Sequence, residues 1–295
     1  MKGETMRELY LRARAKINLT LDVTGKREDG YHDVEMIMQT VNLYDELWIQ
    51  RIYAPTIRLH SNLKWLPRDQ RNLAYQAAQL MRDTYGFTDG VYIYLKKRIP
   101  VAAGLGGGSS DAAAVLVGLN KLFNLKITQE ELMALGLQLG ADVPYCILRG
   151  TALATGIGEK LTALAPMPRC WVVLAKPDIY ISTAQVYGNL KLENIKKRPS
   201  TQQVIEAIQK GELEEVASGL YNVLETVTGK DYEVIGQIKK FLNKHGSLGS
   251  IMSGSGPTVF GIFNDKEKAR YAARQLREQN MARQVFVTTI FNEER

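Results

Sequence analysis

The chain has 295 residues and a formal net charge of +7, and its 45% hydrophobic and 23% charged content is typical of a water-soluble enzyme with two domains of about 100–200 residues. It has no run of about 18 apolar residues and no apolar leader, so we expect neither a membrane span nor a secretory signal. Its two cysteines lack metal-ligand spacing and its basic residues are scattered, so we expect a cytoplasmic protein with no Cys/His metal site and no nucleic-acid partner.

The N-terminal stretch alternates between apolar and polar residues, which is typical of a strand. Residues 9–23 are expected to form one long strand, or two strands broken near Ala15. Lys16 and Asn18 interrupt an otherwise apolar run. A lysine in such a run is most often a strand-edge residue whose stem lies along apolar surface, and the alternative is a chemical role.

An aromatic–histidine pair, Tyr31 and His32, follows the polar turn at 24–30 and precedes a strand over 34–40. The pair is either ordinary hairpin chemistry or a group that stacks on a base and hydrogen-bonds it. Further strands are expected over 41–52 and 57–60. A helix is then expected over 73–85 with Asn72 as its cap, and a strand over 91–96.

The glycine-rich stretch from Pro100 to Asp111 lies between that strand and an alanine-rich helix expected over 112–123. Four glycines occur among the five residues from Gly104 to Gly108. A backbone without Cβ atoms lets a ligand approach its N–H groups, Ser109 or Ser110 could cap the helix, and a helix N-terminus favours an anion. A flexible loop is the alternative, but the helix that follows directly favours phosphate binding.

Three better-known phosphate-binding patterns do not match this stretch. A P-loop needs a lysine before the serine, and a dinucleotide loop needs a third glycine where Ser109 stands. A protein kinase would carry H-R-D and D-F-G tripeptides, and neither occurs in the chain. The stretch therefore predicts a different kind of phosphate cradle.

Asp142 follows a helix expected over 128–139, which starts with a capping box. Because Pro144 favours an extended Val143, we expect Asp142 at a helix-to-strand junction, with a strand over 145–148. An aspartate there is usually a turn former, but functional residues concentrate at such junctions. Hairpin strands are expected over 151–155 and 159–164.

The proline-containing segment 165–168 is the best candidate boundary, which predicts domains at 1–164 and 165–295. The order of strand, helices, strand, glycine loop, strand, helix and strand then predicts a ferredoxin-like α+β layer. Its strands are expected over 170–175, 246–252, 258–263 and 284–290, and its helices over 183–187, 202–209, 213–220, 224–228, 232–243 and 266–278.

Three separated motifs resemble those of the galactokinase, homoserine kinase, mevalonate kinase and phosphomevalonate kinase (GHMP) superfamily. They are Ala15-Lys-Ile-Asn-Leu19, the glycine-rich stretch and Ser253-Gly-Ser-Gly-Pro-Thr258. The resemblance implies an α+β, two-domain GHMP-kinase fold. Its N-terminal domain is a mixed sheet with helices, similar to ribosomal protein S5, its C-terminal domain is ferredoxin-like, and its active site lies in the cleft between them.

Three details resemble one branch of the superfamily: Asp29-Gly-Tyr-His32, the triple glycine 106–108 and Leu139-Gly-Ala-Asp-Val-Pro144. This branch transfers the γ-phosphoryl group of ATP to the 2-hydroxyl of a CDP-linked methylerythritol, in the non-mevalonate isoprenoid pathway. The resemblance thus implies a small-molecule kinase that uses ATP and Mg²⁺.

The resemblance also implies roles for single residues: Asp142 matches the catalytic base and Lys16 the catalytic lysine. The residues that match the substrate side are Asn18, the cytidine-recognising Tyr31 and His32, the diphosphate contact Thr183, and Tyr187, where the family often has a phenylalanine. The residues that match the ATP side are Pro100, Val101, Ala102, Ala103, Gly104, Leu105, Gly106, Gly107, Gly108, Ser109 and Ser110, with Asn72 and Lys97 where adenine contacts are expected. Some members hold Mg²⁺ with a loop serine and a glutamate, and no position here clearly matches that glutamate, so no protein ligand to the metal is assigned.

Two rivals to this reading are distinguishable by experiment. A binding protein of the same fold, without turnover, would need neither Lys16 nor Asp142, and ADP release with candidate alcohols separates it. A kinase for another small alcohol, such as homoserine or mevalonate, would not need the Tyr31–His32 pair, and competition by CDP or CMP separates it. The sequence leaves the oligomeric state open.

Overall fold

The computed structural model describes residues 6–293, and these form two compact units, each assembled from several segments of the chain. The first unit contains the chain up to Ala15, Tyr44–Val101 and Gly106–Leu148. The second contains Lys16–Leu43, Ala102–Leu105 and the chain from Arg149 onward. The boundary proposed between residues 164 and 165 divides the chain in a different way, and it stays a prediction.

Two long strands contribute to both units, which is why the units are discontinuous in sequence. They are β1 (Glu8–Lys26) and β2 (His32–Ile52). β1 is one unbroken strand, as the first of the two alternatives predicted. Its residues alternate between exposed and less exposed as far as Arg14, and every residue from Ala15 to Val23 is buried. The same strand therefore has one covered face in the first unit and two in the second.

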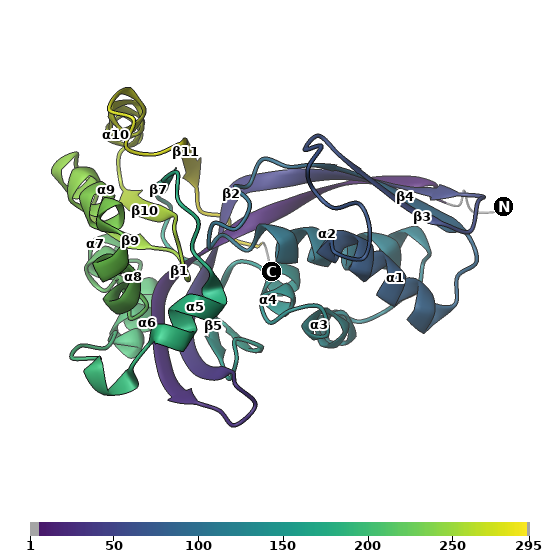
Figure 1. Cartoon of the computed structure of the whole chain (residues 1–295), viewed down its shortest axis with the longest axis horizontal. Helices are drawn as coiled ribbons and strands as arrows, with labels where there is room; N and C mark the ends of the chain where they lie inside the picture. Colours follow the sequence, from purple (N-terminus) through teal and green to yellow (C-terminus); the bar gives the residue numbers. More distant parts are fainter. Residues whose placement is uncertain (1–5, 294–295) are drawn as a thin grey trace. The chain divides into compact units, whose positions relative to one another are not determined.

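The first unit is a mixed sheet with helices. Its strands lie in the order β3–β4–β2–β1, with β3 and β4 parallel and β2 and β4 antiparallel. In Figure 1 its helices lie along one face of these strands. Helix α2 packs against both α1 and α4. The further elements of this unit are β3 (Ile57–Ser61), α1 (Leu73–Tyr85), β4 (Gly90–Lys96), α2 (Gly107–Leu122), α3 (Gln129–Leu137) and α4 (Val143–Leu148).

The strand expected over 145–148 is wrong, because these residues belong to helix α4. Proline is tolerated in the first turn of a helix, where its missing N–H needs no partner, so Pro144 does not force an extended chain. The Cys146 amide donates to the Asp142 carbonyl over 3.1 Å and closes the first turn. Asp142 consequently joins two helices rather than a helix and a strand.

The second unit contains an antiparallel sheet in the order β11–β7–β10–β9. This is the strand order of a βαββαβ ferredoxin-like layer, so the predicted layer is confirmed. Strand β8, which no pattern predicted, pairs in parallel with β1, and β5 joins β2 to β6. The strands of this unit are β5 (Thr151–Thr155), β6 (Lys160–Ala163), β7 (Trp171–Lys176), β8 (Tyr221–Asn222), β9 (Gly249–Met252), β10 (Val259–Phe263) and β11 (Gln284–Thr289).

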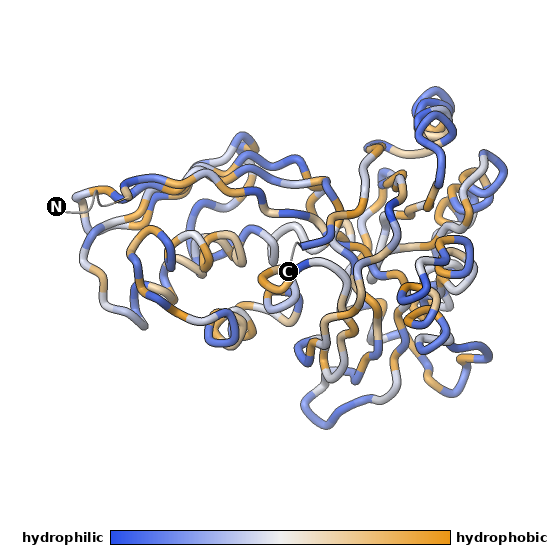
Figure 2. The backbone as a smooth tube through the Cα atoms, turned by 180° about the vertical axis from the view of Figure 1, so that it is seen from behind, coloured by the Kyte–Doolittle hydropathy of each residue, from blue (hydrophilic) through white to orange (hydrophobic). Residues whose placement is uncertain are grey.

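The helices of the second unit bury one side each. In α10 (Lys266–Glu278) the buried side consists of three alanines and Leu276, while the rest of the helix is polar, as its largely blue course in Figure 2 shows. It packs against β7 and β11. No helix within 6–293 combines the length and apolar character that a membrane crossing requires. The other helices are α5 (Thr183–Asn189), α6 (Thr201–Lys210), α7 (Leu213–Ser218), α8 (Glu225–Asp231) and α9 (Glu233–Lys244), with a 3₁₀ turn at Leu192–Asn194.

Candidate active site

The glycine-rich stretch leads into helix α2, which begins at Gly107, earlier than expected. Gly106 precedes it with a left-handed φ of 65°, a conformation that favours glycine, and no side chain caps the helix. The predicted serine cap is therefore wrong. Ser110 lies inside the helix, and its Oγ donates instead to the Arg14 carbonyl over 2.6 Å. Without a cap, the first-turn N–H groups remain available to an anion.

Gly104 packs against a second glycine loop, 253–257, in the second unit. A Cβ at Gly104 would lie 2.2 Å from the Ser253 carbonyl oxygen, and its φ is +75°. Ser253 Oγ also donates to the Gly104 carbonyl over 2.9 Å. Only glycine fits this close approach of two backbones, so the glycines here serve packing as well as ligand access.

Lys16 and Asn18 lie beside the same pair of loops. The Lys16 amide donates to the Leu105 carbonyl over 3.0 Å, and its Nζ donates to Asn18 Oδ1 over 2.9 Å. A Cβ at Gly254 would lie 3.4 Å from Asn18 Oδ1 and 3.6 Å from Lys16 Nζ. Lys16 is 5% exposed and Asn18 fully buried, so the strand-edge interpretation of Lys16 does not hold. Burial of a charged amine is costly unless the group is paired and hydrogen-bonded.

The 253–257 loop is fixed by neutral side chains. Asn222 Nδ2 donates to the carbonyls of Met252 and Gly254, over 2.9 and 2.8 Å, and the Thr183 and Ser255 hydroxyls lie 2.7 Å apart. Sequence reasoning singled out Thr183 but missed Asn222. A lone asparagine carries no motif, and its partners lie about thirty residues further along the chain.

An aromatic cluster lies at the start of β2. The ring of His32 lies 5.3 Å from that of Tyr187, between centroids, and the two are tilted by 41°. Tyr31 is 59% exposed, so its ring is open to a ligand. Burial, and then the charge of Lys26, lowers the pKa of His32. The neutral form of the ring is thus favoured at pH 7, and in that form one ring nitrogen donates and the other accepts.

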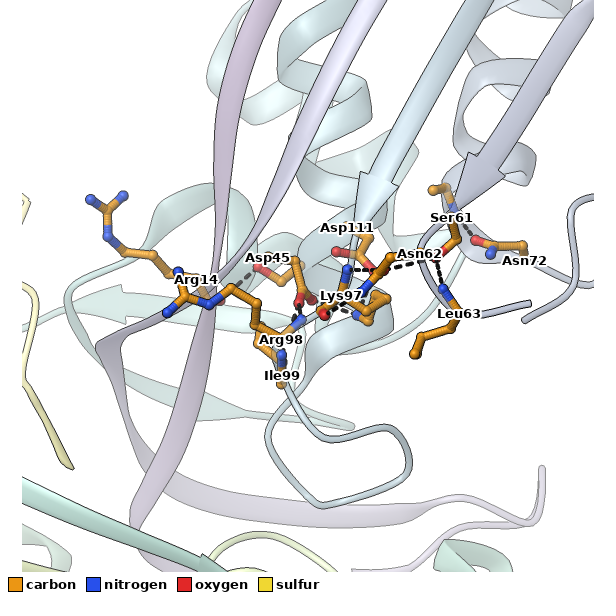
Figure 3. Close-up of polar contacts among 12 residues, drawn as sticks. Arg14, Asp45, Ser61, Asn62, Leu63, Asn72, Lys97, Arg98, Ile99 and Asp111 are labelled. Atoms are coloured by element: carbon orange, nitrogen blue, oxygen red, sulfur yellow. Dashed lines mark hydrogen bonds and ion pairs between the residues drawn. The ribbon is translucent and has the colours of Figure 1, made fainter. Parts of the chain in front are cut away.

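Asn72 and Lys97, expected near the adenine, are both held by the first unit itself. Asn72 caps α1 as predicted, because its Oδ1 accepts from the Ala74 amide over 3.0 Å. Lys97 is 8% exposed, and its Nζ contacts two carboxylates, Asp45 and Asp111 (Figure 3). Asn62 forms two hydrogen bonds with the Lys97 main chain. Its Oδ1 accepts from the Lys97 amide over 2.7 Å, and its Nδ2 donates to the Lys97 carbonyl over 3.1 Å. The adenine contacts stay a prediction.

Asp142 lies in the first unit, directly before α4 and half-buried. This unit also contains Gly106 to Ser110, the second part of the glycine-rich stretch, and α4 packs against the helix that these residues begin. The Asp142 side chain is therefore partly exposed to solvent. The role of Asp142 as the base stays a prediction.

The described residues do not fit a metal centre built from protein side chains. No group of three or more His, Cys, Asp or Glu residues within 6–293 is arranged to hold a metal ion. Mg²⁺ typically binds through substrate phosphates and water with one or two carboxylates, so a protein cage is not what an ATP-bound ion needs. We therefore assign no protein ligand to the ion.

Two separate segments of the chain match protein-family models. Residues 72–150 match "GHMP kinases N terminal domain", and residues 204–281 match "GHMP kinases C terminal". Among solved structures, a crystal structure of 4-(cytidine 5'-diphospho)-2C-methyl-D-erythritol kinase has a TM-score of 0.83 at 34% identity, covering 97% of this chain and 100% of that one. Homoserine kinase from Cytophaga hutchinsonii has a TM-score of 0.75 at 18% identity, covering 98% and 96%, which shows the shared fold alone.

Two relatives are similar over nearly their whole length, and both are named 4-diphosphocytidyl-2-C-methyl-D-erythritol kinase. The protein of Lachnoclostridium phytofermentans is 50% identical over 283 residues, 96% of this chain and 97% of that protein. The protein of Caldicellulosiruptor saccharolyticus is 51% identical over 269 residues, 91% of this chain and 93% of that protein.

Proposed function

The chain belongs to the 4-diphosphocytidyl-2-C-methyl-D-erythritol kinase family of the GHMP kinases, and from this membership we propose its reaction. It transfers the γ-phosphoryl group of ATP to the 2-hydroxyl of 4-diphosphocytidyl-2-C-methyl-D-erythritol, a step of the non-mevalonate pathway, in the cytoplasm. The observation that carries the proposal is the identity of about half of all residues across nearly the whole chain with relatives of that name.

Phosphoryl transfer depends mainly on positioning and on stabilising charge. We assign the backbone N–H groups of residues 104–110 to the ATP phosphates, in keeping with the uncapped start of α2. Mg²⁺, when bound with ATP, would neutralise charge on the β- and γ-phosphoryl oxygens.

Asp142 is the proposed base. Its carboxylate accepts the proton of the 2-hydroxyl as that oxygen bonds to the γ-phosphorus, and the bond from this phosphorus to the β–γ bridging oxygen breaks to release ADP. Lys16 is proposed to assist by offsetting charge on the transferred group. Its support is the burial of the Lys16 side chain and the hydrogen bond from the Lys16 backbone amide to the Leu105 carbonyl of the glycine-rich stretch.

The substrate alcohol is assigned to the second unit. We propose that Tyr31 and His32 hold the cytosine, with Tyr187 as the second aromatic, Thr183 on the diphosphate, and Asn18 near the alcohol. The neutral His32 ring and the exposed Tyr31 ring support this assignment.

The test is ADP release with ATP, Mg²⁺ and either the CDP-linked alcohol or its CDP-free counterpart. We expect turnover with the first compound only, and inhibition by CDP. Equal turnover with both compounds would contradict the cytidyl assignment. No ADP release with any alcohol would favour a binding protein without catalysis.

A further inference from the structure

A triad of charged side chains lies buried in the first unit. Lys97 Nζ is 2.5 Å from Asp45 Oδ2 and 2.7 Å from Asp111 Oδ2 (Figure 3). The three side chains are only 4%, 0% and 4% exposed, in the order Lys97, Asp45 and Asp111. Taking such charges out of water is costly and is often no more stabilising than an apolar core of the same shape. The triad therefore calls for an explanation other than stability.

The triad lies at both ends of the glycine-rich stretch. Asp45 Oδ1 accepts from the amides of Arg98 and Ile99, over 2.5 and 2.8 Å, where the chain leaves β4 and approaches Pro100. Asp111 lies in α2, into which the stretch leads. The Lys97 ammonium thus connects the segment before the stretch, through Asp45, to helix α2 after it, through Asp111.

The ammonium also lies directly beside the helix start. A Cβ at Gly107 would be 3.3 Å from Lys97 Nζ and 3.0 Å from Ile99 Cγ2. The hydrogen bond from Ser110 Oγ to Arg14 ties the same turn to β1. The position of the first-turn amides of α2 consequently depends on these contacts.

The two carboxylates are not equivalent. Asp45 has contacts to the ammonium and to two amides, whereas Asp111 Oδ1 has no hydrogen-bond partner within residues 6–293. Burial raises the pKa of Asp111 well above its usual range, although Lys97 opposes this. Burial alone would lower the pKa of Lys97, but the charges of Asp111 and Asp45 outweigh it and raise the pKa. The ammonium therefore stays charged at neutral pH, and Asp45 is the member that fixes the most backbone.

We propose that Asp45, Lys97 and Asp111 are positioning residues that hold the glycine-rich stretch in the conformation that binds the ATP phosphates. The proposal rests on the proposed function only in that the stretch binds a nucleotide. None of the three side chains needs to touch the ligand, since each acts through the backbone on either side of the stretch.

The test compares Asp45→Asn with Glu46→Gln. Both changes turn a carboxylate into an amide on neighbouring residues of β2, but Glu46 is 43% exposed and pairs only at the surface, with Lys96 and Arg98. An asparagine at position 45 would turn an N–H group toward the Lys97 ammonium or toward the backbone amides of Arg98 and Ile99. These partners are all donors, so one of the present hydrogen bonds would be lost. We expect Asp45→Asn to raise the KM for ATP and the Kd for ADP about tenfold or more, because a displaced binding backbone costs that much. The KM for the alcohol should stay within about twofold, as should all constants of Glu46→Gln.

Unchanged ATP and ADP constants in a folded Asp45→Asn protein would overturn the proposal, and so would an equal rise in both KM values, which indicates general loosening. If Asp45→Asn does not fold, the triple variant Asp45→Asn, Lys97→Met, Asp111→Asn decides, because it leaves no unpaired buried charge. It should fold and show the same rise in the ADP constant, and a normal ADP constant would overturn the proposal. Calorimetry with ADP needs no alcohol, so failure of the proposed alcohol substrate would leave this measurement intact.

Discussion

The two units hold their glycine loops by different means. In the first unit, the buried charged triad Asp45–Lys97–Asp111 fixes the backbone on both sides of the glycine-rich stretch. In the second, the neutral amide of Asn222 and a serine hydroxyl fix the 253–257 loop. Removing one member of a buried ionic network leaves an unpaired charge, whereas losing a neutral hydrogen bond costs about 0.5–1.5 kcal/mol. The first unit should therefore be the more sensitive to single substitutions.

The largest effect is expected at the one carboxylate of the first unit that we assign to chemistry. Asp142→Asn keeps the shape of the side chain but removes its proton-accepting charge, and base catalysis contributes about 10²–10⁴-fold. We expect kcat to fall by a factor of at least about 10², while the Kd for ADP stays near the wild-type value. Rapid-quench kinetics and calorimetry measure the two quantities, and near-normal turnover would remove Asp142 from the role of base.

The next effect is on stability. Lys97→Met leaves two buried carboxylates without their cation, which should lower the free energy of unfolding by about 3–5 kcal/mol. The neighbouring Lys96→Met is the matched control, because Lys96 is 51% exposed and its surface pair with Glu46 contributes about 0–1 kcal/mol. Urea titrations of both variants measure the difference, and equal stabilities would contradict the importance of the triad.

A smaller loss of stability is expected in the second unit. Asn222→Ala removes the two bonds to the Met252 and Gly254 carbonyls and the one that Oδ1 accepts from the Leu224 amide. At about 0.5–1.5 kcal/mol for each of these three neutral hydrogen bonds, urea denaturation should show a loss of about 1.5–4.5 kcal/mol, whose midpoint lies below that of Lys97→Met. If Asn222→Ala proved the more damaging of the two, the contrast between ionic and neutral support would be wrong.

The smallest effect is a pH dependence confined to the second unit. Because the folded protein lowers the pKa of His32, the neutral ring predominates above the ordinary value of about 6.5. The stability that comes from the neutral ring is present above that pH and is lost as the pH falls through the lowered pKa. The KM for the cytidyl alcohol should rise over the same acidic range, while the Kd for ADP does not follow it.

His32→Gln provides the control for this pH profile. It keeps hydrogen-bonding groups but does not titrate, so the acidic rise in the KM should flatten. A rise of the same size in His32→Gln would place the titrating group elsewhere.

Local patterns in the sequence predicted most of the fold. The capping box of α3 is a clear case: the Thr128 amide donates to Glu131 Oε2, and the Glu131 amide donates to the Thr128 hydroxyl. Asn72 is another, because a cap acts within two residues of itself. α4 was missed because the rule for a residue before proline outweighed the tolerance of proline in a first helical turn.

The candidate site was predictable where it follows a motif, and not where it depends on distant partners. The resemblance singled out the glycine-rich stretch, Lys16, and the His32 and Tyr187 rings, and the structure places these two rings together. Asp45 lies 52 residues from its lysine, and Asn222 about thirty residues from the loop that it holds. Such pairs are made by the tertiary fold, so no local spacing reveals them.

The identity of the product is the most direct test of the proposed reaction. The protein is incubated with ATP, Mg²⁺ and 4-diphosphocytidyl-2-C-methyl-D-erythritol, and ADP and the phosphorylated alcohol are quantified by phosphorus NMR. We expect one ADP for each alcohol that carries a new phosphate on its 2-hydroxyl. ADP with free inorganic phosphate, or a phosphate on another hydroxyl, would contradict it.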